Sequence, residues 1–253
     1  MEGQLLLDLT GGKYGPWIVT NKGDQTVRSL MDEHYSRQTI GARQFCRPGN
    51  NLVLRTADGT GAWISWRGIR DDGVEDAWEC TAFRNTSNMI SSELIHWAVY
   101  ATICEWGHVF PASGIITYVD PKKVKSDVPG YCFIRAGFKK VGVSKHRKLL
   151  LFQLPITRNY LAKRVSETIN YCIENMSLAL DFGEFYEAVW FQQYAQKQME
   201  WIAHLQSKIL SGEPQAWMGL VPIMHLYELE ELISPYEGVD QIIKEIEDTL
   251  PLS

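Results

Sequence analysis

The sequence has no uninterrupted apolar run of the roughly 18 to 20 residues that a membrane-spanning helix needs. Its start, Met1-Glu2-Gly3, lacks the basic and then apolar pattern of a signal peptide. Cysteine is sparse: the five thiols are widely spread and include no CxxC pair. The sequence therefore predicts neither a disulfide framework nor a thiolate zinc site. We expect a cytoplasmic protein with no membrane partner and with reduced, buried cysteines.

Internal repeats and low-complexity segments are also absent, which excludes solenoids and disordered tails. The 253 residues are 45% hydrophobic and 22% charged, an ordinary globular composition. The net charge of −5 argues against an indiscriminate nucleic-acid binder. The charge is unevenly distributed, however. Residues 122–148 hold nine Lys and Arg against the single acid Asp127, whereas residues 213–253 hold nine acids against one Lys.

The first half of the chain reads as strands followed by a helix. Predicted strands cover residues 17–20, 51–56, 63–66 and 77–83. The hairpin signal Asp58-Gly59 joins two of them into a β-meander. Helical spacing begins at Thr26 and breaks at His34-Tyr35, and a stronger helix signal runs over 91–107 with Ser91 or Ser92 as its N-cap.

The stretch 114–138 is the part of the chain around which the rest is organised. A β-branched run over 115–119 ends at Asp120-Pro121 and is followed by a basic loop, a short helix and the turn Ala136-Gly137-Phe138. A last strand, 148–154, stops at Pro155. Open α/β sheets place their chemistry at the carboxyl ends of strands, which makes Asp120 the leading candidate for a functional residue.

From residue 157 onward the pattern is helical only. Residues 160–176 and 182–210 read as two helices, and short acidic helices continue to residue 250. We therefore expect an α/β domain over 1–155 and a helical C-terminal region over 156–253. An aromatic stripe over 182–201 predicts core packing or a homodimer contact through this helical tail.

The order of these elements resembles that of the GNAT N-acyltransferase fold. The resemblance covers about residues 30–154 and implies a mixed, twisted sheet with flanking helices, here followed by an all-helical appendage. The motifs Tyr118-Val119-Asp120-Pro121, Pro129-Gly130-Tyr131-Cys132-Phe133 and Ala136-Gly137-Phe138 look most like the phage Mom-type branch, where this stretch reads roughly F/Y-A-D-P, G-T-I-Y and A-x-G-F. His34-Tyr35, Arg84 and Ser91 or Ser92 stand where Mom-type proteins carry similar residues.

Mom-type proteins add a carbamoylmethyl group to the exocyclic amine of adenine in phage DNA. The resemblance therefore implies a phage-encoded enzyme in the bacterial cytoplasm, with DNA and an acyl donor as partners. Acetyl-CoA or a related donor and iron are the implied cofactors, with His34 as a metal ligand.

The chain departs from these families in two places. The glycine-rich pyrophosphate loop of ordinary acetyltransferases is replaced by residues 84–92, RNTSNMISS. Cys132-Phe133 stands where the Mom-type branch has Ile-Tyr, so an aromatic hydroxyl would have to come from Tyr131.

The resemblance assigns roles to particular residues. Asp120 orients or deprotonates the attacking amine, Arg84 binds an anion, Ser91 or Ser92 donates hydrogen bonds at the helix start, and Tyr131 acts as an acid. The expected cofactor-binding residues are Arg84, Asn85, Ser91 and Ser92. The expected nucleic-acid contacts are His34, Tyr35, Lys122, Lys123 and Lys125.

Each assignment has an alternative without catalysis. Asp120 also fits a simple Asp-Pro turn, Arg84 a surface strand end, and the serines a helix cap. Two further functions stay open at this point. One is an acetyl-CoA-dependent N-acetyltransferase acting on a protein or small amine, and the other is a non-catalytic interaction or anti-defence protein.

Overall fold

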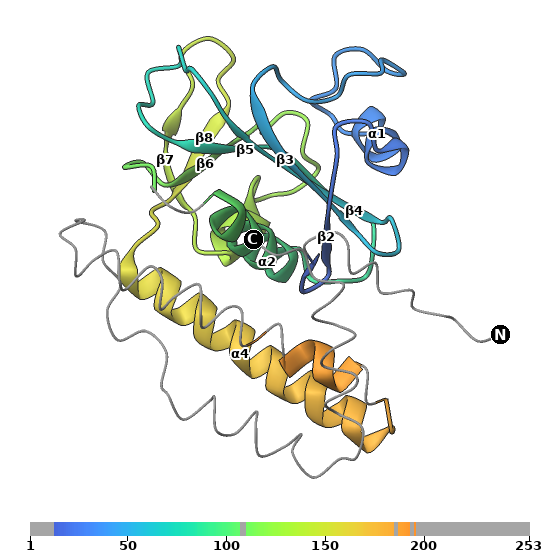
Figure 1. Cartoon of the computed structure of the whole chain (residues 1–253). Helices are drawn as coiled ribbons and strands as arrows, with labels where there is room; N and C mark the ends of the chain where they lie inside the picture. Colours follow the sequence, from blue (N-terminus) through green and yellow to red (C-terminus); the bar gives the residue numbers. More distant parts are fainter. Residues whose placement is uncertain (1–12, 107–109, 185–186, 193–194, 196–253) are drawn as a thin grey trace. The chain divides into compact units, whose positions relative to one another are not determined.

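The structure, a computed structural model, describes residues 13–106, 110–184, 187–192 and 195 (Figure 1). The chain divides into two compact units. One comprises Gly11–Ile156, and the other combines Met1–Thr10 with Thr157–Ser253. Each unit is described by itself.

The first unit contains one eight-stranded sheet in the order β1-β2-β3-β4-β5-β6-β8-β7. Its strands are Lys13–Tyr14 (β1), Trp17–Thr20 (β2), Asn50–Thr56 (β3), Gly61–Arg67 (β4), Trp78–Asn85 (β5), Ile115–Val119 (β6), Lys139–Val143 (β7) and Leu150–Leu154 (β8). All neighbouring strands are antiparallel except β5 and β6, which are parallel. The predicted mixed α/β sheet and its β-meander are thus confirmed.

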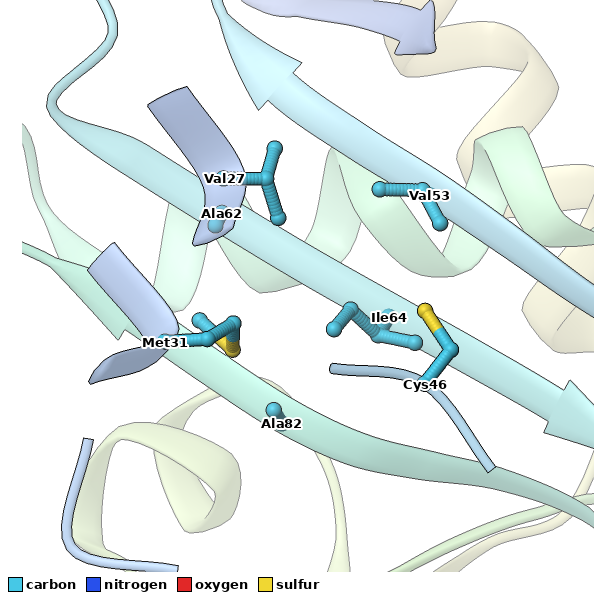
Figure 2. Packing of buried hydrophobic residues seen from close by; sticks show 7 residues of the cluster. All are labelled: Val27, Met31, Cys46, Val53, Ala62, Ile64 and Ala82. Atoms are coloured by element: carbon cyan, nitrogen blue, oxygen red, sulfur yellow. The ribbon is translucent and has the colours of Figure 1, made fainter. Parts of the chain in front are cut away.

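One face of the meander is covered by α1 (Gln25–Asp32). The Asp24 carboxylate caps this helix by accepting a hydrogen bond from the Val27 N–H at 3.0 Å. Figure 2 shows how the helix packs, with side chains from α1, β3, β4 and β5 meeting in a single apolar cluster. The cluster consists of Val27, Met31, Cys46, Val53, Ala62, Ile64 and Ala82. Val27 and Met31 are four residues apart on the helix, and Ala62 and Ile64 are two residues apart on β4, as burial of one face requires.

The opposite face is covered by α2 (Ser91–Trp106) and the short α3 (Tyr131–Arg135) (Figure 1). The hydroxyls of Ser65 on β4 and Thr102 on α2 form a buried hydrogen bond of 2.7 Å. The Trp17 indole N–H donates to the Leu94 carbonyl at 2.8 Å. Burial of polar groups is tolerated here because each finds a partner.

Two details differ from expectation. The N-cap position of α2 is Ile90, whose carbonyl accepts from the Leu94 N–H at 3.1 Å, so Ser91 and Ser92 are the first helical residues and not caps. Strand β7 was not predicted, because its residues Lys-Lys-Val-Gly-Val are exposed at the sheet edge and lack an apolar run.

The second unit begins with α4 (Arg158–Asp181), capped by the Thr157 hydroxyl. Phe182 and Gly183 end this helix, with Gly183 at φ 73°, and residues 187–192 are helical again. The expected helix start at residue 182 is therefore wrong, because Gly183 ends the preceding helix there. The rest of the predicted tail, including most of the aromatic stripe, lies outside the described residues. No helix in the described ranges is long and apolar enough to cross a membrane.

Gly130 holds α3 against the sheet. It has φ 83°, and a Cβ at this position would lie 2.5 Å from Cζ of Phe152 on β8. Only glycine combines the left-handed conformation with this close approach. The Pro-Gly step before α3 is therefore a packing requirement as well as a turn.

Substitution of Gly130 by alanine tests this requirement. Gly73→Ala is the matched control, since Gly73 has φ 81° but open space around its Cβ position. We expect the control to cost about 1 to 2 kcal/mol from backbone strain alone. Gly130→Ala should cost about 1 to 3 kcal/mol more because of the clash with Phe152. Urea denaturation measures both, and equal costs would contradict the packing role.

Candidate functional site

The site lies where the only parallel pair of the sheet separates. Strands β5 and β6 pair over just three residues each, Trp78–Cys80 with Ile115–Thr117. Beyond these residues β5 follows β4 as far as Asn85, and β6 follows β8 as far as Val119. Two neighbouring strands that follow different partners must open a gap between their carboxyl ends.

A β-bulge at Thr81 marks the point of separation. Ile64 pairs with Ala82 and the next residue, Ser65, pairs with Cys80, so Thr81 is the extra residue on β5. Its hydroxyl donates to the Ile64 carbonyl at 3.3 Å. Bulges bend a strand and increase its twist, and they often adjoin functional sites. The bulge thus accounts for the departure of β5 from β6.

A cavity of about 140 Å³ lies in the gap between β5 and β6. It is lined from both strands, from the segment after α1 and from the start of α3. The lining residues are His34, Tyr35, Thr81, Ala82, Phe83, Thr117, Tyr118, Val119, Val124, Gly130, Cys132 and Phe133. The two expected nucleic-acid contacts His34 and Tyr35 are among them.

His34 and Tyr35 form a stacked pair at this cavity. Their ring centroids are 4.4 Å apart with an interplanar angle of 30°. Nδ1 of His34 lies 2.7 Å from the Ser36 hydroxyl, and the ring also has a hydrogen bond to the backbone of Phe83. Burial and the nearby Arg84 charge lower the pKa of His34 to about 4. His34 is therefore neutral at neutral pH.

Tyr35 connects this pair to Asp120. Its hydroxyl lies close enough to the backbone and the charge of Asp120 for both to affect its pKa, although Asp120 itself is not among the residues that line the cavity. Burial is the main reason that the pKa of Tyr35 is raised, so the phenol keeps its proton. The segment after α1 and the end of β6 are thus joined at the cavity.

Asp120 ends β6 and begins a turn. Its Oδ1 accepts from the Lys122 N–H at 3.0 Å, and its carbonyl accepts from the Lys123 N–H at 3.2 Å. In the described part of the chain its Oδ2 has no hydrogen-bond partner. The turn and the functional interpretation are therefore compatible, since one carboxylate oxygen holds the loop and the other is available to a ligand.

Arg84 does not point a free guanidinium at the cavity. Its Nη2 donates to Glu33 Oε2 at 2.5 Å and its Nη1 to the Glu33 carbonyl at 3.1 Å. Through these two bonds it fixes the backbone just before His34-Tyr35. The structure supports a positioning role for Arg84 more directly than the expected anion contact.

Tyr131 lies outside the cavity lining and is 56% exposed at the start of α3. Cys132 lines the cavity instead, and burial raises the pKa of its thiol. A second lining tyrosine, Tyr118, donates to Asp72 Oδ2 at 2.9 Å. Burial and this bond raise the pKa of Tyr118 to about 12. Tyr35 and Tyr118, not Tyr131, are the aromatic hydroxyls of this cavity.

The contact between Tyr118 and Asp72 belongs to a buried charge network. Glu79 on β5 is almost fully buried and accepts from Arg47 at 3.0 Å and from Arg70 at 2.9 Å. Arg70 also pairs with Asp72. Both guanidinium groups lie 5.4 Å from the centroid of the Trp66 ring. The network fixes Tyr118 and thereby one wall of the cavity.

Asn85 organises the loop that leads from β5 into α2. Its amide nitrogen donates to the Met89 carbonyl at 2.8 Å and to the Ser91 hydroxyl at 3.0 Å. Its amide oxygen accepts from Ser87 N–H at 2.9 Å. Within the described residues, no acceptor lies against the N–H groups of Ser91 and Ser92. The helix start could therefore take an anion through its backbone.

The residues around His34 do not fit the implied iron site. No group of three or more His, Cys, Asp and Glu side chains that could hold a metal ion occurs among the described residues. The His34 ring is engaged by Ser36 and by the backbone of Phe83.

Sequence reasoning missed three contributors to the site. The bulge at Thr81 has no sequence signal, because it depends on pairing with β4. Glu33 matters through Arg84, 51 residues away in the sequence. The sequence interpretation treats Cys132 only as the residue that stands where the Mom-type branch has Ile. Its place on a short helix, directly before Phe133, could have indicated that it faces the interior.

The low pKa of His34 generates a prediction about pH. The folded protein should hold His34 neutral down to about pH 4, while the unfolded chain protonates it near its ordinary pKa of 6.5. Because the unfolded state then binds more protons, this contribution to stability is present above pH 6.5 and is lost as the pH falls toward 4. NMR titration of ¹³C-labelled histidine measures the pKa directly.

The matched pair for this titration is Arg84→Gln and Arg43→Gln. Removal of the Arg84 charge should raise the pKa of His34 toward 6.5, whereas Arg43 is exposed elsewhere and should leave it unchanged. The signal is assigned by its loss in His34→Gln. A His34 that titrates near pH 6.5 in the folded wild type would contradict the described burial.

The chain was compared with protein-family models, with curated proteins and with solved structures, and none of them matched.

Proposed function

We propose that this protein is a DNA-modifying enzyme of the Mom kind that transfers a small acyl-like group to a nucleobase amine. The observation that carries the proposal is the cavity between the separating strands β5 and β6, which is lined by Tyr35 and by Val119, the residue directly before Asp120. Three lysines, at 122, 123 and 125, follow Asp120 directly and are exposed. An amine on a polyanionic substrate requires a carboxylate to take its proton, a protonated phenol to donate a hydrogen bond and a basic loop to bind the phosphates.

The sheet supports the finer assignment to a GNAT-like fold. An antiparallel meander, a helix, one parallel strand, a short helix and a closing antiparallel hairpin follow the element order of that fold. Such a fold places its reaction between the two central strands that separate, where this chain has its cavity. Fold likeness alone says nothing about the acceptor, so the acceptor is argued from the site.

The proposed mechanism uses the side chains around the cavity. A base must leave the duplex to reach it, and its exocyclic amine then approaches the free Oδ2 of Asp120. Asp120 orients the amine and takes its proton as the new bond from nitrogen to the transferred carbon forms and the bond from that carbon to the donor breaks, so that the donor leaves with the electron pair. Tyr35, still protonated, donates a hydrogen bond to the polar atom of the incoming group. His34 stacks on Tyr35 and holds it in place.

An acyl donor supplies the group that is transferred. The unpaired N–H groups at the start of α2, with the loop ordered by Asn85, are the residues that would hold an anionic part of such a donor. The loop contains no glycine to allow the closest backbone approach. The cavity, at about 140 Å³, admits only the reacting ends of donor and acceptor.

The test is nucleoside mass analysis of DNA from cells that make the protein. We expect a new modified nucleoside with wild type. Asp120→Asn should lower its amount about a hundredfold or more, since asparagine keeps the turn to Lys122 but cannot take a proton. Tyr35→Phe should lower it about a hundredfold, and the matched Tyr131→Phe should leave it unchanged because Tyr131 is exposed outside the cavity.

The alternatives give other results. An unchanged nucleoside profile together with tight calorimetric binding of acetyl-CoA would favour an N-acetyltransferase for a protein or small amine. Full biological effect of the Asp120→Asn variant would favour a non-catalytic interaction protein. Either outcome would overturn the proposed function.

A further inference from the structure

The loop that joins β7 to β8 is a compact basic tip. Its four residues, Lys145, His146, Arg147 and Lys148, are all exposed. The loop is closed by two hydrogen bonds, from the Ser144 N–H to the Leu149 carbonyl at 2.8 Å and from the Leu149 N–H to the Ser144 hydroxyl at 2.9 Å. The tip therefore presents its charges from an ordered backbone.

The strand register places this tip beside the candidate site. Val119 at the end of β6 pairs with Leu150, and Leu150 pairs with Val143. The hairpin loop thus leaves the sheet at the same edge at which β6 reaches Asp120. Neighbouring strands are spaced by about 4.8 Å, so the tip lies roughly 10 Å across the sheet from the end of β6.

The charge in this region is not neutralised within the described chain. None of the nine Lys and Arg in residues 122–148 forms an ion pair among the described residues. Residues 11–156 contain 19 Lys and Arg against 13 Asp and Glu, a net charge of +6. Outside 122–148 the same unit has 10 against 12. Its entire positive excess therefore comes from this one region.

The composition of the tip narrows its partner. The run Ser-Lys-His-Arg-Lys contains no Phe, Tyr or Trp, the large aromatic rings on which binders of single strands stack successive bases. It also contains no apolar residue that could enter a bilayer. Phosphate contacts without stacking or insertion suit the backbone of a duplex.

We propose that the β7–β8 loop binds the phosphate backbone of duplex DNA next to the target base. This inference rests on the proposed function for the identity of the polyanion. The loop would anchor the duplex while the base occupies the cavity between β5 and β6. It is a contact separate from the lysines at 122, 123 and 125, which follow Asp120.

The test compares two triple variants that each remove three charges. Lys145→Gln/Arg147→Gln/Lys148→Gln changes the tip, and Lys22→Gln/Arg28→Gln/Arg43→Gln changes the far side of the same unit. Binding of a fluorescent duplex of about 20 base pairs is followed by anisotropy between about 50 and 200 mM salt. Three lost phosphate contacts should reduce the slope of log K against log salt by about 2.7 and weaken binding at least tenfold, whereas the control keeps the wild-type slope.

Four outcomes would overturn the inference. The tip variant could keep the wild-type salt slope, or the salt slope could fall equally in both triple variants. A single strand of the same length could bind as tightly as the duplex with the same dependence on the tip. Phosphatidylserine vesicles could bind the wild type more tightly than the duplex does and lose that binding in the tip variant.

Nucleoside analysis of the same variants separates this inference from the proposed function. A modified nucleoside together with a wild-type salt slope in the tip variant would contradict the loop contact and still support the proposed enzyme activity. A lower salt slope in the tip variant, without any modified nucleoside in the cells, would support the DNA contact and contradict the proposed chemistry. Asp120→Asn should keep the wild-type slope, since it changes no cation.

Discussion

The short parallel pairing of β5 with β6 is the constraint on which the rest of the site depends. Only three residues of each strand pair, and the bulge at Thr81 then turns β5 away with β4 while β6 continues with β8. A longer pairing would close the gap with backbone hydrogen bonds. Because the strands separate, side chains from four different segments can line one cavity. The cavity therefore exists because the ladder between β5 and β6 stops.

Polar clamps then fix the side chains around this gap. Arg84 holds Glu33 and so positions the His34-Tyr35 pair, while Arg70 and Asp72 hold Tyr118. The Arg84–Glu33 and Tyr118–Asp72 contacts lie at the surface, whereas Arg70 and its partner Glu79 are buried, where a charge without its partner is costly. Arg84, Glu33, Arg70 and Asp72 do not line the cavity themselves. They hold in place the aromatic residues that do. Among the described residues, Oδ2 of Asp120 has no hydrogen-bond partner and so remains suited to a ligand.

The charge distribution follows the same geometry. The antiparallel register of β6, β8 and β7 brings the Asp120 turn and the basic hairpin tip to a single edge of the sheet. Residues far apart in the sequence thus form one positive region of an otherwise acidic chain. Arg47, whose side chain is half exposed, and the buried Arg70 are, by contrast, paired with Glu79 and Asp72.

The sequence by itself determined the strands of the meander, the helices that begin near residues 25 and 91, and Asp120 at the end of a strand, because apolar periodicity and turn residues act locally. It could not reveal β7, which is polar and forms only by pairing with β8, or the bulge at Thr81. The resemblance assigned an acid role to Tyr131, which is 56% exposed, and the sequence left Arg84 open between an anion contact and a surface strand end, whereas Glu33 binds it. Which hydroxyl lines the cavity and which arginine is already paired depend on contacts between distant segments. Only the tertiary structure decides such contacts, because they are set by strand register and packing and not by local preference.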